Sequence, residues 1–356
     1  MKKALIALAC LLLAFAVLVG GYVSYVYISY ERLDDRLVLD IDKGADDYLK
    51  IGQTYTAATY NIGFGAYGPD FTFFMDGGKE SRARSYESCK ANVLGAAQTL
   101  KDLDADIILF QEVDIKATRS HHINQYELLR ENFPHMDAVK AINYDSAYLF
   151  YPLTKPHGKS LSSLVTMSRF NIFDSLRRSL PISTDFSKFF DLDRCYSVSR
   201  LDTESGRNLY LYNVHMSAYS GDEKIRQAQV DMLFDDITER VRQGDYVICG
   251  GDFNHDLPGD SVQILNGDSK HEYTWAQSFP VKKIPGVIEL CDNYEGGELV
   301  PTARNNDMPY EEGKTFVIVI DGFFVSPDVE VLKVENHDTG FLYSDHNPVT
   351  IEFRLK

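Results

Sequence analysis

Carboxylate, amide and imidazole side chains follow several apolar runs of this sequence, at the points where those runs end. One such cluster lies in VICGGDFNHD, from Val247 to Asp256, where Asp252 and Asn254 come directly after two glycines. Alternate residues of a strand share a face, so these two side chains would lie side by side. The paired glycines leave room for a ligand to approach the backbone. An ordinary turn has the same composition, and this stretch alone fits either interpretation.

The same residue types recur at the ends or on the faces of the other predicted strands. Open α/β sheets place their binding sites at strand ends, and several such coincidences in one chain favour a shared site. The residues concerned are Asn61 in TYN, Glu112 in QE, Asn213 and His215 in NVH, Asp321 in ID, and Asp345 and His346 in SDH.

These ligand types favour a hard cation. Mg²⁺ characteristically takes one or two carboxylates, keeps bound water and lets substrate phosphate complete its coordination. The five cysteines are scattered without close-spaced pairs, so we expect neither a disulfide framework nor a zinc site. A single histidine is more often structural, but beside such carboxylates we expect the histidines to bind phosphate oxygens or move protons.

Strand-like and helix-like runs alternate from Thr54 onward, which predicts one α/β domain. A helix is expected between Asp222 and Arg242, where apolar residues recur at helical spacing. The chain has 356 residues, 44% of them hydrophobic, and can bury a large core. Its formal net charge of -16 works against long-range attraction to nucleic acid or anionic lipid, although a local basic pocket remains compatible with it.

An uncharged run from Ala4 to Tyr30 is longer than the roughly 20 residues that a helix needs to cross a bilayer. Four tyrosines close the run, as at a membrane interface, whereas a cleaved signal peptide would have a shorter core. We expect a cytoplasmic stub and single-pass anchor over residues 1–30, a linker with an edge strand over 31–52, and a catalytic domain over 53–356. Acidic residues after the run favour an extracytoplasmic catalytic domain.

In their order along the chain, the TYN, QE, NVH, GDFN, ID and SDH motifs resemble those of the endonuclease/exonuclease/phosphatase superfamily. This superfamily includes deoxyribonuclease I-like nucleases and neutral sphingomyelinases, and the resemblance extends from about Thr54 to Lys356. It implies a four-layer α/β/β/α sandwich, with two mixed sheets packed face to face and helices outside. It also implies metal-dependent hydrolysis of phosphate esters.

The resemblance further implies a role for each site residue. Glu112 would be the principal Mg²⁺ ligand, with Mn²⁺ as a substitute, and Asn61 and Asp345 would support the metal site. Asp252 and Asn254 would position and activate water, and Asp321 would hold His346 against phosphate. His215, which shares the NVH motif with Asn213, would bind phosphate or protonate the leaving group. Arg194 resembles a phosphate-contacting arginine. The acid that pairs with His215 is not identified from the sequence, and the formal general base is left open.

Two loops fit the motifs less directly. The aromatic-rich stretch from Gly65 to Cys89 is interpreted either as a substrate-gating loop or as a packed surface loop. The stretch from Pro152 to Ser160, with Lys155, His157 and Lys159, is expected to be a solvated basic loop.

Together these features predict a monomeric, membrane-anchored, magnesium-dependent hydrolase that cleaves a phosphodiester. A phospholipid or headgroup substrate suits the tether, which raises the effective concentration of the active site at the bilayer. One alternative is an extracytoplasmic nuclease acting on nucleic acid. Another is a catalytically silent module that binds phosphorylated ligands, although such a module has no chemical need for the full set of acidic residues and histidines.

Overall fold

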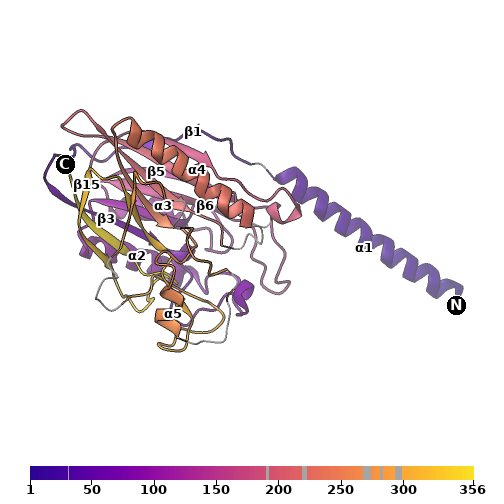
Figure 1. The fold of residues 1–356 in the computed structure, drawn as a ribbon. Coiled ribbons are helices and arrows are strands. Elements are labelled where there is room, and N and C mark those ends of the chain that lie inside the picture. Colours follow the sequence, from indigo (N-terminus) through magenta and orange to yellow (C-terminus); the bar gives the residue numbers. More distant parts are fainter. Residues whose placement is uncertain are drawn as a thin grey trace.

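The computed structural model describes residues 1–356 apart from 31, 190–191, 219–222, 268–272, 274, 281–283 and 293–298. Within this part of the chain, two seven-stranded sheets pack face to face, and helices cover their outer faces (Figure 1). Each sheet contains both parallel and antiparallel pairs. The four-layer α/β sandwich expected from the resemblance is therefore confirmed.

The first sheet brings together three strands that carry site residues. β10 runs parallel to β9 and antiparallel to β14, so that Asp252 lies opposite both His215 and Asp321. In spatial order its strands are β1 (Leu37–Val38), β7 (Ile172–Ser179), β8 (Cys195–Asp202), β9 (Asn208–His215), β10 (Tyr246–Asp252), β14 (Asp321–Val325) and β11 (Glu289–Cys291).

The second sheet positions the remaining site residues. β3 runs parallel to β4, which pairs Asn61 with Gln111, and antiparallel to β16. In spatial order its strands are β15 (Val329–Asn336), β16 (Val349–Leu355), β3 (Thr54–Asn61), β4 (Ile107–Asp114), β6 (Leu161–Ser168), β5 (Asp137–Asp145) and β2 (Ile41–Asp42).

The remaining described elements are helices and one small strand pair. The α-helices are α1 (Lys2–Ser29), α2 (Tyr86–Asp102), α3 (Gln125–Asn132), α4 (Glu223–Arg242) and α5 (Ser261–Asn266). The 3₁₀ turns are η1 (Gly63–Gly65), η2 (Phe74–Asp76) and η3 (Phe186–Phe189), and β12 (Ala303–Arg304) pairs with β13 (Val317–Ile318). The helix expected from Asp222 corresponds to α4, and Asp222 itself lies outside the described residues.

The strands at the centre of the sandwich are apolar at consecutive positions because both of their faces are buried. In β4, Ile107 and Leu109 join the core between the two sheets, whereas Ile108 and Phe110 pack under α2 and α3. A separate apolar cluster lies between α4 and the outer face of the first sheet. The site is therefore built on the rigid middle of the molecule.

The segment expected as a linker contributes to both sheets. β1 pairs with β7 of the first sheet, and β2 pairs with β5 of the second. Leu49 is fully buried in the core between the sheets, and Leu39 and Ile41 pack against that core. Much of residues 32–52 is thus folded onto the domain.

The N-terminal helix α1 projects away from the sandwich (Figure 1). Among the described residues it is the one helix long and apolar enough to cross a membrane, a property that signal sequences share. Its C-terminal end packs on the domain, where Val26 is buried against Ala147 and Phe189.

Candidate active site

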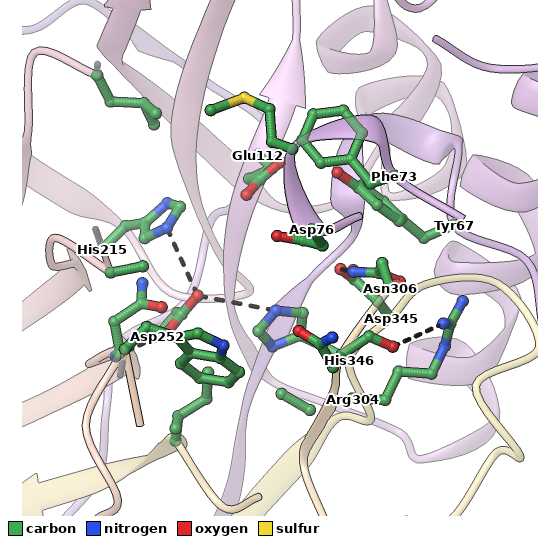
Figure 2. A pocket seen from close by; sticks show the side chains of 18 of the residues that line it. Tyr67, Phe73, Asp76, Glu112, His215, Asp252, Arg304, Asn306, Asp345 and His346 are labelled. Carbon is green, nitrogen blue, oxygen red and sulfur yellow. Dashed lines mark hydrogen bonds and ion pairs between the residues drawn. The ribbon is translucent and has the colours of Figure 1, made fainter. Parts of the chain in front are cut away.

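One pocket gathers most of the predicted site residues, at the ends of β4, β9 and β10 and in the segment before β16 (Figure 2). Asn61, Asn213 and Asp321 are not among its lining residues. The predicted residues that line it are Glu112, Arg194, His215, Asp252, Asn254, Asp345 and His346.

Asp252 ends β10, and donors from separate segments hold its carboxylate. Its Oδ2 accepts a hydrogen bond from Nδ2 of Asn61 at 3.0 Å, and its Oδ1 accepts one from the backbone N–H of Asn254 at 2.9 Å. Asn254 has a φ of 50°, a conformation that Asn tolerates better than most residues. Burial, and then the negative charge of Asp321, raise the pKa of Asp252 to about 7.

The paired glycines before Asp252 serve packing instead of ligand access. A Cβ on Gly250 would lie 2.4 Å from the Phe323 ring, and one on Gly251, where φ is +149°, would lie 2.0 Å from the backbone oxygen of Val214. The space beside these glycines, where a ligand was one expectation, is therefore filled by β14 and β9.

His346 faces Asp252 from one side and is held from behind by Asp321. Its Nδ1 is 2.8 Å from Oδ2 of Asp321, and its Nε2 is 3.8 Å from Oδ2 of Asp252. Burial alone would lower the pKa of His346, but the carboxylates around it, Asp321 above all, raise that pKa to about 10. The imidazole therefore carries a proton at neutral pH and presents it on Nε2.

His215 faces Asp252 from the opposite side (Figure 2). Its Nε2 is 3.5 Å from Oδ2 of Asp252, and its buried Nδ1 has no hydrogen-bond partner among the described residues. Burial, followed by the positive charges of Arg194 and His346, lowers the pKa of His215 well below its usual value. Asp252 is thus the carboxylate that faces the neutral imidazole, and among the described residues no acid is bonded to Nδ1 of His215.

Glu112 reaches the pocket through an irregularity in β4. The register of β4 against β6 shifts between Phe110 and Val113, and Glu112 has a φ of 55°. In a regular strand, Glu112 would share the face of Phe110 and point toward α2 and α3, so the bulge redirects its carboxylate into the pocket. Burial raises the pKa of Glu112, and the charge of Arg119 opposes that rise.

Asp345 lies in the same pocket and is oriented by two side chains. Its Oδ2 accepts a hydrogen bond from Nδ2 of Asn306 at 2.7 Å, and its Oδ1 accepts one from the Ser344 hydroxyl at 3.2 Å. Oδ1 of Asn306 is buried and has no hydrogen-bond partner among the described residues.

Two predicted amides lie behind the pocket. Asn61 uses its Nδ2 to hold Asp252, while its Oδ1 accepts the N–H of Gly63 at 3.0 Å, so its side chain positions Asp252. Asn213 is buried between the sheets, where its Oδ1 accepts a hydrogen bond from Nε2 of Gln111 at 2.8 Å. This bridge ties β9 to β4 directly behind His215 and Glu112.

Two arginines and two amides that line the pocket, Arg119, Arg304, Asn305 and Asn306, were not predicted from the sequence. Arg119 pairs with both carboxylate oxygens of Asp114, at 3.1 and 2.9 Å, and lies over the Phe64 ring. Arg304 and Asn306 come from TARNND, a polar run whose composition could have marked the segment. With Arg194, three arginines line the pocket of a chain whose formal net charge is -16.

The two unassigned loops both contribute to the pocket wall. The stretch from Gly65 to Cys89 packs as its own aromatic cluster, and Tyr67, Phe73 and Asp76 line the pocket. In the loop that was expected to be solvated and basic, Lys159 is exposed, but His157 is buried among the rings of Phe64, Phe73 and Phe74. The expectation of a wholly solvated loop is therefore wrong for His157.

Comparison with protein families agrees with this arrangement. The model of the Endonuclease/Exonuclease/phosphatase family matches residues 58–346, which include the whole pocket. The chain belongs to this family. Membership supports a hydrolase that acts on phosphate esters. No curated protein matches the chain.

Solved structures of this family share the fold. A family member from Bacteroides vulgatus is 18% identical with a TM-score of 0.54, covering 85% of this chain and all of that one. ANGEL2, a 2',3'-cyclic phosphatase solved with adenosine-2',3'-vanadate, is 14% identical with a TM-score of 0.56, covering 90% of this chain and 99% of its own. TDP2 from D. rerio, solved with a single-strand DNA product, is 15% identical with a TM-score of 0.52, covering 85% and 99%.

The donor atoms in the pocket fit a divalent hard cation of the kind that this family uses. Oxygen donors come from Glu112, Asp252 and Asp345, and no cysteine is among the lining residues. Ligand atoms of Asp252, Asp321 and His346 also lie within 4.8 Å of one another. In this second group Nδ1 of His346 is 2.8 Å from Oδ2 of Asp321, so its geometry also fits a hydrogen-bonded Asp–His pair.

Proposed function

We propose that this protein is a membrane-anchored, metal-dependent hydrolase that cleaves a phosphodiester by in-line attack of water. The observation that carries the proposal is the position of the Asp252 carboxylate between two imidazoles, in a pocket that three arginines and three further carboxylates line. A base, a protonated acid and anion-binding groups therefore face one small volume, as hydrolysis of an anionic ester requires.

Asp252 is the group that orients and deprotonates the attacking water. Asn61 and Asn254 fix both of its oxygens, so the carboxylate is preorganised for one water position. Its raised pKa of about 7 makes it a better proton acceptor than an exposed carboxylate, because a general base works best when its pKa is near the operating pH.

The two histidines divide the remaining work. His346 is protonated and held by Asp321, so its Nε2 donates to a phosphoryl oxygen and stabilises the charge that builds up as water attacks. His215 is neutral and lies across the pocket, where it contacts phosphate or the leaving oxygen. The guanidinium groups of Arg119, Arg194 and Arg304 add positive charge around the ester.

Glu112 and Asp345 are the proposed ligands of Mg²⁺, with Mn²⁺ as a substitute. When bound, the ion would act as a Lewis acid that neutralises phosphate charge in the transition state. The bulge of β4 and the hydrogen bond from Asn306 hold these two carboxylates toward the pocket.

A substrate panel tests this function. The full chain in detergent micelles would be given sphingomyelin, phosphoinositides, plasmid DNA, RNA and bis(p-nitrophenyl) phosphate, each with Mg²⁺ and each with excess chelator. We expect hydrolysis of at least one diester that chelator abolishes and Mg²⁺ or Mn²⁺ restores. Turnover of DNA or RNA alone would favour a nuclease. Binding of phosphorylated ligands without any turnover would favour a silent module, and full activity in chelator would contradict the proposal.

A further inference from the structure

Three large apolar side chains on the loop before β6 are exposed to solvent. Phe150, Tyr151 and Leu153 have exposed fractions of 52%, 68% and 83%. Soluble proteins seldom gather such side chains in one place without a partner. We call these three residues the apolar rim.

The last turns of α1 contact the loop that carries the apolar rim. The Tyr22 hydroxyl donates to the backbone oxygen of Tyr148 at 3.1 Å, and the Tyr148 N–H donates to the Tyr25 hydroxyl at 3.0 Å. The ring of Tyr22 also packs edge-on against Phe150, with centroids 5.3 Å apart. These contacts therefore fix the position of the rim relative to α1.

This contact places the rim at a defined depth if α1 spans a membrane. A hydrocarbon core of about 30 Å takes up roughly 20 helical residues at about 1.5 Å each. Counted from Ala4, the first uncharged residue after two lysines, such a span ends near Val23. Tyr22 and Tyr25 then lie at the headgroup level, where tyrosine is favoured, and Phe150, beside them, lies at the same level.

The apolar rim also adjoins the mouth of the pocket. The Tyr151 ring lies 5.6 Å from that of Phe74 in η2, and the next two residues, Met75 and Asp76, line the pocket. On another side, the Tyr30 hydroxyl donates to Asp193 at 3.0 Å, between the pocket residues Leu192 and Arg194. The end of α1 thus contacts two separate segments that lead to the pocket wall.

We propose that the apolar rim inserts into the interface of the bilayer that α1 crosses, and that the pocket hydrolyses a phosphodiester displayed by a lipid of that same membrane. The choice of lipid rests on the proposed function, whereas insertion of the rim does not. We choose a bilayer as the partner because the rim lies next to the apolar surface of α1, at the same depth as the tyrosines of that helix. Nucleic acid is disfavoured as the partner of the rim, because the rim side chains are uncharged and the chain has a formal net charge of -16.

Insertion of the rim is tested without reference to activity. In a Cys10→Ser background, whose other four cysteines are buried, Leu153→Cys would be labelled with an environment-sensitive fluorophore. Phe173→Cys is the matched control, because Phe173 is also exposed, at 63%, but lies far from α1. The hydroxyl of Ser179, at the C-terminal end of β7, donates to the backbone oxygen of Leu33, just after α1. Phe173 lies near the other end of β7, about 20 Å from Ser179. The full chain would be reconstituted in phosphatidylcholine vesicles that contain lipid with a shallow spin label.

We expect the spin label to quench the probe at residue 153 several-fold more than the probe at residue 173. Equal quenching would overturn insertion. If the probe at residue 153 is not quenched and the protein is a dimer in detergent, the rim would instead contact a second copy of the chain. That result would also overturn insertion.

Lipid hydrolysis is tested by replacing the whole rim. The Phe150→Ser/Tyr151→Ser/Leu153→Ser variant should lose at least about tenfold in turnover of vesicle lipid, because the pocket is no longer held at the surface. Its turnover of soluble bis(p-nitrophenyl) phosphate should stay within about twofold of wild type, since no rim residue lines the pocket. Phe173→Ser should change neither rate.

Unchanged lipid turnover in the rim variant would overturn the second half of the proposal, as would a wild type that cleaves nucleic acid and no lipid. A wild type that cleaves no diester at all would contradict the proposed function, while the quenching experiment would still decide whether the rim inserts.

Discussion

The side chains of the site take their properties from a few named contacts. Asp252 meets Asn61, His215 and His346 on one oxygen, so residues that are distant in sequence fix its orientation. Burial, and then the charge of Asp321, raise its pKa. Glu112 differs because it reaches the pocket through a backbone irregularity and not through partners. Changes at these two residues should therefore have different effects.

Replacing Glu112 with Gln should weaken the binding of the metal without unfolding the domain. The amide keeps the shape of the side chain but removes its charge, so we expect the Mg²⁺ concentration for half-maximal activity to rise at least about tenfold. A Mg²⁺ titration of diester hydrolysis measures this, with the surface variant Glu127→Gln as the control. An unchanged Mg²⁺ dependence would remove Glu112 from the metal site.

His157 should make the stability of the fold depend on pH. Burial, and then the charge of Arg119, lower the pKa of His157 to about 3. Between about pH 6.5 and 3 the unfolded chain binds a proton at His157 that the folded chain does not, so the free energy of unfolding falls as the pH falls. The contribution is at most about 1.4 kcal/mol per pH unit.

Urea unfolding at several pH values between 4 and 7 would measure this dependence. The slope of stability against pH should be smaller for His157→Asn than for wild type. Coincident slopes would show that His157 titrates in the folded protein much as it does in the unfolded chain.

At the scale of elements, the parallel pair of β9 and β10 sets the spacing of His215 and Asp252. The two strands approach so closely that Gly251 leaves no room for a side chain beside Val214. The sequence predicted a strand here and a functional reason for the glycines, but the reason proved to be packing. The neighbouring strand that fills the space belongs to another part of the chain, and local sequence does not reveal it.

Gly251→Ala should therefore destabilise the fold. Its Cβ would lie 2.0 Å from the backbone oxygen of Val214 and must also adopt a φ of +149°. We expect a loss of at least about 3 kcal/mol in the free energy of unfolding, since the clash adds to a backbone strain of about 1–3 kcal/mol. Gly206→Ala is the matched control, because φ is +78° there and nothing lies within 4 Å. Equal losses for the two variants would contradict the packing argument.

At the scale of the whole molecule, the sequence predicted most of what its local patterns encode. The alternating runs predicted an α/β domain, and the family resemblance predicted the four-layer sandwich. The strand ends predicted six of the residues that line the pocket, and the resemblance added Arg194. Arg119 and Asn306 were missed because loops carry them into the pocket, and Arg304 was missed because its strand, β12, is only two residues long. The edge strands β1 and β2 are two residues each, too short for any periodicity, and exist only through pairing with β7 and β5.

The anchor and the site also form one unit at this scale. α1 contacts the loops around residues 148 and 193, and both loops lead to the pocket wall. A sequence shows an apolar helix and a catalytic motif separately. The two are brought together by tertiary contacts between the tyrosines of the N-terminal helix and the catalytic domain. In the sequence, these tyrosines indicate only a membrane interface.

Hydrolysis of bis(p-nitrophenyl) phosphate by Asp252→Asn, His346→Ala and the double variant tests most directly whether this pocket cleaves phosphodiesters. Wild type should show Mg²⁺-dependent turnover, and each single variant should lose about a hundred- to ten-thousand-fold in rate. The double variant should lose less than the product of the two, because both residues act on one transition state. All variants should keep the wild-type circular dichroism spectrum. Turnover at the wild-type rate in folded Asp252→Asn and His346→Ala would mean that the chemistry happens elsewhere.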